Sequence, residues 1–188
     1  MELPAGKNPY TTLSHELMHS RAYITFYRDM VQVNGIEKDY SYTGAASGVA
    51  MVAINEKSEV ALVGQWRYPV NMYTWELPAG TREEGEEPLV TAKRELLEEA
   101  GASAEEWTPL GAYLVECSKS SQESYVFLAE KLSIGQNKPD EDEGLELLWI
   151  PFEKALTLVE SGEIHDALSV IGLLRAERFL RTRAPKQL

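Results

Sequence analysis

The chain has 188 residues, 44% of them hydrophobic and 26% charged, and its formal net charge at pH 7 is -12. This composition is typical of a globular protein with one buried core, which excludes a globally disordered chain. The acidic balance excludes a general nucleic-acid binder and a protein that binds anionic membranes, because both need a basic face. An acidic protein that acts on an anionic substrate must therefore recruit cations or place a few arginines locally.

The cysteine content favours a reducing compartment, since Cys117 is the only cysteine and cannot form an intramolecular disulfide. The first residues lack the basic and apolar segments of a signal peptide. No apolar run reaches the roughly 18 residues that a membrane span needs. We therefore expect a soluble protein of the cytoplasm, with no membrane partner and no nucleic-acid partner.

Strand-like alternation begins at about residue 22, whereas residues 1–20 show no clear period. Asn-Gly at 34–35, between two such runs, is a strong signal for a β-hairpin. A second and more buried hairpin is predicted around a polar turn at 55–59. The runs that form these strands are 22–28, 30–33, 39–43, 49–54 and 60–63.

A helix is predicted over 88–100, with proline at its start and Gly101 just past its end, where these residue types are favoured. Further strands are expected at 108–116, 124–132 and 145–150, and further helices at 151–160 and 164–181. The chain thus divides into an N-terminal tail and hairpin extension, 1–46, and a main domain, 47–188.

Three glutamates of the predicted helix, Glu95, Glu98 and Glu99, stand at i, i+3 and i+4 and so project from one face within one turn. Like charges repel, so this clustering adds nothing to helix stability. Mg²⁺ prefers such oxygen ligands and usually shares its coordination shell with substrate phosphates. It also activates water and neutralises charge that develops at phosphorus. A Glu-Glu pair alone would be better explained as a solvated helix face.

The pattern extends well beyond a pair, from residue 80 to residue 102. Its fixed positions are Gly80, Glu86, Arg94, Glu95, Leu96, Glu98, Glu99, Gly101 and Ala102. This spacing resembles the Nudix box at every defined position, with a small residue at the closing apolar position. The chain therefore resembles the Nudix hydrolase superfamily.

The resemblance implies an α/β/α sandwich on a mixed sheet, preceded by a small antiparallel sheet, with the box as a loop-helix-loop that binds Mg²⁺ or Mn²⁺. It implies that Glu95, Glu98 and Glu99 are metal ligands, with the main-chain carbonyl of Ala79 as a further one. Catalysis is then expected from Glu98 and Glu99 together with Arg94, which would orient the glutamates through ion pairs.

The same resemblance gives three box residues a structural role. Glu86 would brace the loop, and Gly80 and Gly101 would supply backbone conformations that side chains obstruct.

The flanking sequence resembles the branch that hydrolyses ADP-ribose and nucleotide sugars. The similar segments are Gln65–Pro69, Trp75–Gly80 and the end of the chain from Trp149 onward. This branch implies a homodimer formed through the N-terminal sheet. It also implies that Arg67 contacts the substrate diphosphate, which suits a fork-shaped guanidinium. A salt bridge at the rim of the site is the alternative for this arginine.

The chain departs from the branch after the box, where residues 116–124 contain no proline. In the branch this loop often supplies an acid that helps to activate the attacking water. Glu123 is the first candidate and Glu116 the second, while Gln122 holds the matching position if the register shifts by one. A solvated loop glutamate explains Glu123 equally well.

An aromatic side chain is expected to stack on the nucleobase. Tyr23, Phe26 and Tyr27 in the N-terminal strands are candidates, although aromatic residues in strands are more often part of a core.

His15-Glu16-Leu-Met-His19 matches a competing motif, the His-Glu-x-x-His pattern of zinc peptidases. On a helix both histidines would bind zinc and Glu16 would be the general base, with Asp166 or a glutamate as third ligand. The motif is short and lies in a weakly periodic stretch, so two surface histidines are the simpler explanation.

We predict metal-dependent hydrolysis of the pyrophosphate bond of nucleoside diphosphate sugars to a nucleoside monophosphate and a sugar phosphate. ADP-ribose is the first substrate expected, and GDP-mannose or another nucleotide sugar the second. A catalytically silent Nudix-fold nucleotide sensor is the main alternative, although no box glutamate is missing. The zinc peptidase is a distant one.

Overall fold

The computed structural model describes residues 3–21, 24–135 and 145–183. The chain forms two compact units, one of residues 1–46 with 116–122 and the other of residues 47–115 with 123–188. Residues 116–122, expected in the main domain, thus belong to the first unit. Within the described ranges, no helix is long and apolar enough to cross a membrane.

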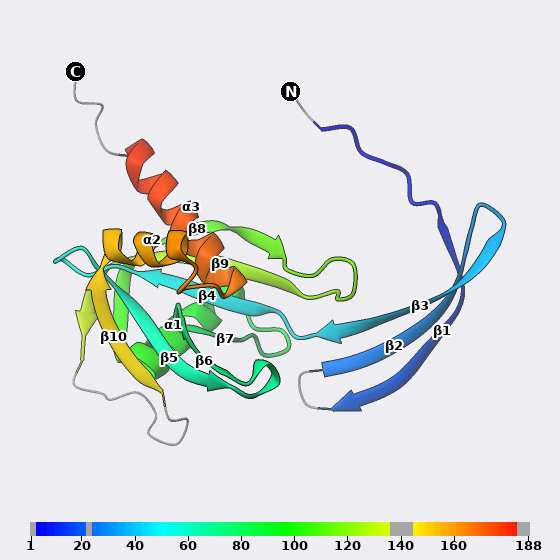
Figure 1. Cartoon of the computed structure of the whole chain (residues 1–188), viewed down its shortest axis with the longest axis horizontal. Helices are drawn as coiled ribbons and strands as arrows, with labels where there is room; N and C mark the ends of the chain where they lie inside the picture. Colours follow the sequence, from blue (N-terminus) through cyan, green and yellow to red (C-terminus); the bar gives the residue numbers. More distant parts are fainter. Residues whose placement is uncertain (1–2, 22–23, 136–144, 184–188) are drawn as a thin grey trace. The chain divides into compact units, whose positions relative to one another are not determined.

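The first unit is a three-stranded antiparallel sheet of β1 (Tyr10–Arg21), β2 (Ile24–Val33) and β3 (Ile36–Ala45), in the order β1-β2-β3 (Figure 1). The predicted turn between β2 and β3 is confirmed, since Asn34 and Gly35 both have positive φ, 51° and 78°. The 116–122 segment joins this sheet, because the N–H of Thr43 donates to the carbonyl of Lys119.

The second unit contains two sheets (Figure 1). The mixed sheet has the order β7-β4-β9-β8, with β4 and β9 parallel and the other pairs antiparallel. The antiparallel sheet has the order β10-β5-β6. Their strands are β4 (Gly48–Ala53), β5 (Glu59–Arg67), β6 (Met72–Glu76), β7 (Ala79–Thr81), β8 (Ala102–Leu114), β9 (Glu123–Ile134) and β10 (Glu146–Pro151). The helical elements are the 3₁₀ turn η1 (Tyr68–Val70) and the helices α1 (Pro88–Ala100), α2 (Phe152–Ser161) and α3 (Ala167–Arg183).

Helices cover both faces of the mixed sheet, because β4 and β9 are apolar on both sides. Val49 and Met51 of β4 pack with Leu96 of α1 in one core. Val52 points to the opposite face and packs with Leu173 of α3 in the other. The expected α/β/α sandwich on a mixed sheet is therefore confirmed.

The prediction of a second hairpin around 55–59 is wrong, because β4 and β5 lie in different sheets. The polar turn itself is present, closed by a hydrogen bond from the N–H of Asn55 to the carbonyl of Glu59 and by one isolated bridge between Ile54 and Val60. Beyond it β4 pairs with β9 and β5 pairs with β10. Strands buried on both faces carry no alternation that could identify a partner, so sequence proximity was a poor guide here.

The His-Glu-x-x-His segment is not a helix but part of β1, the strand for which the sequence showed no period. A register irregularity between Leu17 and His19 further changes the spacing along this strand. The Nδ1 of His15 lies 2.8 Å from Oδ1 of Asp29, and the imidazole stacks on Tyr27. The helix that the zinc-peptidase alternative requires is absent.

The helix α1 has the predicted bounds, with Pro88 in its first turn and Gly101 as its C-terminal cap. Gly101 adopts the left-handed conformation, with φ 59° and ψ 25°, and its N–H contacts the carbonyls of Leu96 and Leu97. Glycine reaches this conformation without the steric cost that a Cβ imposes. The end of the helix that carries the glutamates is therefore fixed by one backbone conformation.

We predict that Gly101→Ala lowers the free energy of unfolding by about 1 kcal/mol, because alanine is strained in the left-handed region. Gly101→Asn should lose less, since asparagine tolerates this conformation better. Urea denaturation of the three proteins measures both changes. Equal loss in the two variants would contradict the explanation from backbone strain.

Candidate active site

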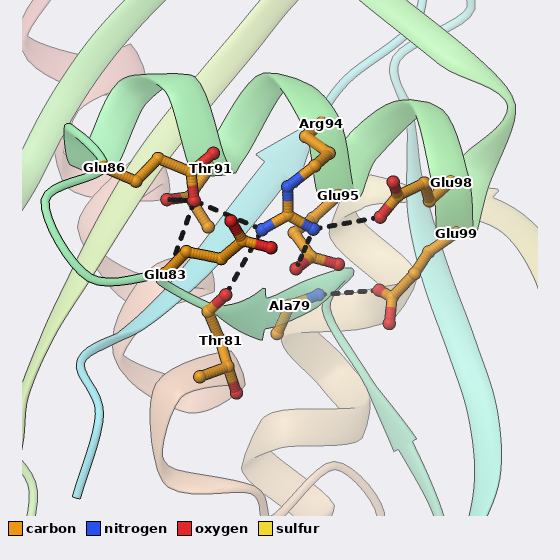
Figure 2. Close-up of polar contacts among 9 residues, drawn as sticks. All are labelled: Ala79, Thr81, Glu83, Glu86, Thr91, Arg94, Glu95, Glu98 and Glu99. Carbon is orange, nitrogen blue, oxygen red and sulfur yellow. Dashed lines mark hydrogen bonds and ion pairs between the residues drawn. The ribbon is translucent and has the colours of Figure 1, made fainter. Parts of the chain in front are cut away.

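The box brings the strand β7 against the helix α1 (Figure 2). Gly80 of β7 lies directly under Glu95, since a Cβ built on this glycine would be 1.9 Å from the Cδ of the glutamate. The side chain of Glu95 is 12% exposed. The absence of a side chain at position 80 is therefore what allows the Glu95 carboxylate to lie over the loop.

Arg94 lies at the centre of the carboxylates in Figure 2. Its Nη1 donates to Glu95 at 2.7 Å and to Glu98 at 3.0 Å, and its Nη2 donates to Glu86 at 3.3 Å. Nη2 also reaches the carbonyl of Thr81 at 3.3 Å. One guanidinium thus contacts three carboxylates that would otherwise repel one another, and these contacts raise the pKa of Arg94.

Glu86 closes the loop that leads into the helix. Besides Arg94 it accepts hydrogen bonds from the hydroxyl of Thr91 at 2.8 Å and the N–H of Glu83 at 3.3 Å. These donors favour the ionised form, so the hydrogen bond from Arg94, followed by that from Thr91, lowers the pKa of Glu86. Thr91 is not a fixed position of the box and was not expected at the site; it is fully buried in α1 and has the side-chain oxygen that this contact needs.

Glu99 ties the far end of the helix to the same strand. The residue is 9% exposed, and its carboxylate accepts a hydrogen bond of 2.8 Å from the N–H of Ala79 (Figure 2). The sequence predicts a role for the carbonyl of Ala79, whereas the contact seen in the structure is made by its N–H. The carbonyl's role as a ligand stays a prediction.

The donor set of the box fits a hard divalent cation in chemical type, because Glu95, Glu98 and Glu99 offer carboxylate oxygens within one helical turn. In the described part of the chain, however, no three His, Cys, Asp or Glu side chains are arranged to hold a metal as they stand. Two of these glutamates face Arg94 and the third faces Ala79. Glu98 has a side chain 50% exposed and can turn away from the arginine without breaking a core contact.

Arg67, at the end of β5, forms a two-pronged ion pair with Glu76 at the end of β6. Its Nε and Nη2 donate to the two carboxylate oxygens at 2.9 and 2.6 Å. Burial raises the pKa of Glu76, but the hydrogen bonds from Arg67 and Thr74 outweigh it, so that the pKa lies below the ordinary 4.5. The arginine is held in place while 43% of its side chain stays exposed.

Glu123 is the first residue of β9, is exposed and accepts a hydrogen bond from the hydroxyl of Tyr125. The next residue, Ser124, pairs with Gly48 of β4, and Gly48 pairs on its other side with Thr81 of β7. Glu123 therefore lies at the end of the mixed sheet where the box begins.

The two other loop candidates belong to the first unit. Glu116 accepts a hydrogen bond from the hydroxyl of Ser118, and the amide of Gln122 donates to the carbonyl of Ala46 at 3.1 Å.

The proposed base-stacking residues do not share a surface. Phe26 and Tyr27 are neighbours on β2, so they point to opposite faces of its sheet. Phe26 is 40% exposed, whereas the ring of Tyr27 already lies between His15 and Tyr42, at centroid distances of 4.9 and 5.3 Å. Tyr23 lies outside the described residues.

An α/β/α sandwich that carries a glutamate-rich loop-helix-loop on its mixed sheet has the architecture and the motif of a Nudix hydrolase. A family model described as the NUDIX domain matches residues 44–169. The chain belongs to this family and is a Nudix hydrolase. Members of the family generally depend on a divalent metal.

Two relatives and one solved structure illustrate the likeness. An ADP-ribose pyrophosphatase of Bacillus subtilis is 36% identical over 159 residues, which are 83% of this chain and 86% of the relative. A methanol dehydrogenase activator of Bacillus methanolicus is 30% identical over 165 residues, 86% of this chain and 89% of the relative. The crystal structure of an ADP compounds hydrolase matches with a TM-score of 0.82 and 21% identity, over 96% of this chain and 99% of that one, and supports the fold.

We predict that Gly80→Ala lowers hydrolytic turnover by about 10²-fold or more while the melting temperature changes little, because the new Cβ displaces only the flexible end of Glu95. Gly85→Ala is the matched control. This glycine has φ 78° and no atom within 4 Å of an added Cβ, so its replacement should cost stability and keep activity. The same loss of turnover in both variants would disprove the role assigned to Gly80.

We also predict that Arg67→Ala raises the pKa of Glu76 above its ordinary value, because burial then acts without its main opposing contact. A carboxylate with a lowered pKa stabilises the fold above its unfolded-state pKa and loses that effect as the pH falls through the folded-state pKa. The stability difference between wild type and variant should therefore be largest above pH 4.5 and shrink on acidification.

Carbon NMR of labelled glutamate measures the pKa, and urea denaturation across the pH range measures the stability difference. Arg28→Ala, which removes the partner of the exposed Asp39, is the control and should change stability little. An unchanged pKa of Glu76 in Arg67→Ala would contradict the assignment.

Proposed function

We propose that the protein hydrolyses the pyrophosphate bond of nucleoside diphosphate sugars, with ADP-ribose as the first substrate and GDP-mannose or another nucleotide sugar as the second. The main support is the box itself, in which Glu95, Glu98 and Glu99 share one helical turn against the strand at Gly80. The ADP-ribose pyrophosphatase of Bacillus subtilis is similar to this protein over most of both chains, and this similarity supports ADP-ribose as the first substrate.

The proposed cofactor is Mg²⁺, with Mn²⁺ as a substitute, held by Glu95, Glu98, Glu99 and the carbonyl of Ala79. When bound, it supplies an activated water and neutralises negative charge at the diphosphate. The chain's own contribution is to hold the carboxylates in place, which Arg94 does through its contacts to Glu95 and Glu98.

Two further residues have proposed roles toward the substrate. Arg67 binds the diphosphate oxygens with the part of its guanidinium that Glu76 leaves exposed. Glu123, at the box end of β9, accepts the proton of the water that attacks phosphorus. Attack breaks one P–O bond of the anhydride, and a nucleoside monophosphate and a sugar phosphate leave. Neither Cys117 nor a serine forms a covalent intermediate.

Phe26 and Tyr27 stay proposals for base stacking, and the exposed Phe26 is now favoured because the ring of Tyr27 has two ring neighbours.

We also propose a homodimer formed through the N-terminal sheet. It is supported by β1, an edge strand exposed along all of its 12 residues, since an uncovered edge of this length favours pairing with another chain.

We propose that the enzyme lies in the cytoplasm, which suits the exposed, unpaired Cys117.

The test is release of phosphate from the products by a coupled phosphatase, with and without Mg²⁺. The panel contains ADP-ribose, GDP-mannose, other nucleotide sugars, dinucleoside polyphosphates and nucleoside triphosphates. We expect Mg²⁺-dependent turnover of the nucleotide sugars and poor turnover of the triphosphates. A protein that binds ADP-ribose but hydrolyses no compound of the panel would instead support the nucleotide-sensor alternative.

We predict that Glu98→Gln lowers turnover of ADP-ribose by about 10²-fold or more, because one carboxylate of the metal site is lost. The half-exposed position of Glu98 predicts little change in melting temperature. Glu160→Gln, at an exposed site near the end of α2, is the matched control and should keep full activity. Near-full turnover by Glu98→Gln would refute its assignment as a ligand.

A further inference from the structure

A pocket of about 390 Å³ opens beside Arg67 in the second unit. Two segments far apart in the sequence form it, the β5-β6 hairpin and the start of α3. Its polar lining residues are Arg67, Thr74, Glu76, His165 and Asp166. The proposed mechanism uses Arg67 and leaves the rest of this pocket without a role.

The floor of the pocket is polar and held rigidly. Thr74 and Glu76 are each only 6% exposed, and the hydroxyl of Thr74 donates to Oε1 of Glu76 at 2.6 Å. The same carboxylate binds the Nε and Nη2 edge of Arg67. Within the described residues no protein acceptor contacts Nη1 of this arginine, so the guanidinium presents a fixed, unused edge to an anion.

The opposite wall is fixed by a chain of hydrogen bonds that involves no ligand. The N–H of Leu77 donates to the hydroxyl of Ser169 at 2.8 Å, and that hydroxyl donates to Oδ2 of Asp166 at 2.8 Å. Ser169 is 1% exposed and its own N–H also donates to Oδ2 of Asp166. This chain ties the start of α3 to the residue after Glu76, so the two walls of the pocket are preformed.

The pocket lies close enough to the box for one sugar phosphate to extend from the box into the pocket. Glu76 on its floor precedes Ala79 by only three residues, so their Cα atoms are at most about 11 Å apart. The N–H of Ala79 in turn contacts the carboxylate of Glu99. A diphosphate held at the glutamates and at Arg67 therefore directs one of its two substituents toward this pocket.

The lining favours a sugar over a nucleobase. Carboxylate and imidazole groups accept hydrogen bonds from hydroxyls, and the apolar part of the wall consists of Pro69, Val70 and Met72. Among the described residues that line the pocket there is no Phe, Tyr or Trp to offer the flat face on which a base stacks.

We propose that this pocket binds the sugar distal to the nucleoside, with Arg67 on the adjoining phosphate and Asp166 and His165 as acceptors for the sugar hydroxyls. The inference rests on the proposed function, because it names the part of that substrate which this site takes. The pocket thus determines which sugar diphosphates are cleaved well.

Ala167→Trp tests the proposal, because Ala167 lines the pocket at the first residue of α3 and an indole there takes up space inside it. ADP-ribose and the β-methyl ester of ADP differ only in the distal group. We expect the variant to lower the ratio of kcat/KM for ADP-ribose to that for the methyl ester by about tenfold or more. His165→Ala, with a smaller expected loss, is the second variant if Ala167→Trp does not fold.

Leu174→Trp is the matched control, since it adds the same indole to an exposed site of α3 outside the pocket, and it should leave the ratio unchanged. An unchanged ratio in both Ala167→Trp and His165→Ala, or a wild type that cleaves both substrates equally well, would overturn the pocket assignment while the proposed function stands.

Calorimetry with ribose 5-phosphate separates the two proposals. If the wild type cleaves neither compound but binds ribose 5-phosphate, and Ala167→Trp weakens that binding about tenfold, the pocket assignment stands and the proposed function fails. Binding that is equal in the two proteins, or absent in both, overturns the pocket assignment.

Discussion

The site depends on the repulsion among carboxylates that one helical turn brings together, and on the single guanidinium that offsets it. Arg94 contacts Glu86, Glu95 and Glu98, while Glu99 is held by a backbone N–H of β7. These contacts leave an excess of negative charge on a protein that is already acidic. A divalent cation is the partner that such an excess favours, and an anionic substrate can approach only once that charge is offset.

A second guanidinium is held in the same way. Arg67 is fixed by the buried Glu76 and keeps an exposed edge, so it can attract phosphate without the entropic cost of ordering a long side chain. In both places a carboxylate with a lowered pKa holds an arginine. The first arginine organises acids, whereas the second keeps an exposed positive edge, which we propose binds the substrate diphosphate.

The elements that were predicted well are those with a local cause. Proline at the start of α1 and Gly101 at its end gave both bounds, and Asn34-Gly35 gave the first hairpin. The strand β1 was missed because it is exposed throughout and has no buried face to create a period. The short strand β7 was missed because its three residues become a strand only by pairing with β4.

The sequence by itself determined the family and the residues of the box, because fixed spacing along one helix places side chains on one face whatever surrounds them. It also indicated that the segments 49–54 and 60–63 are more buried than the first hairpin. Only the tertiary structure decided that β4 pairs with β9, that Arg67 binds Glu76, and that the start of α3 closes a pocket beside them. These contacts join residues from separate elements, and no local periodicity or capping preference encodes which distant segment will be the partner.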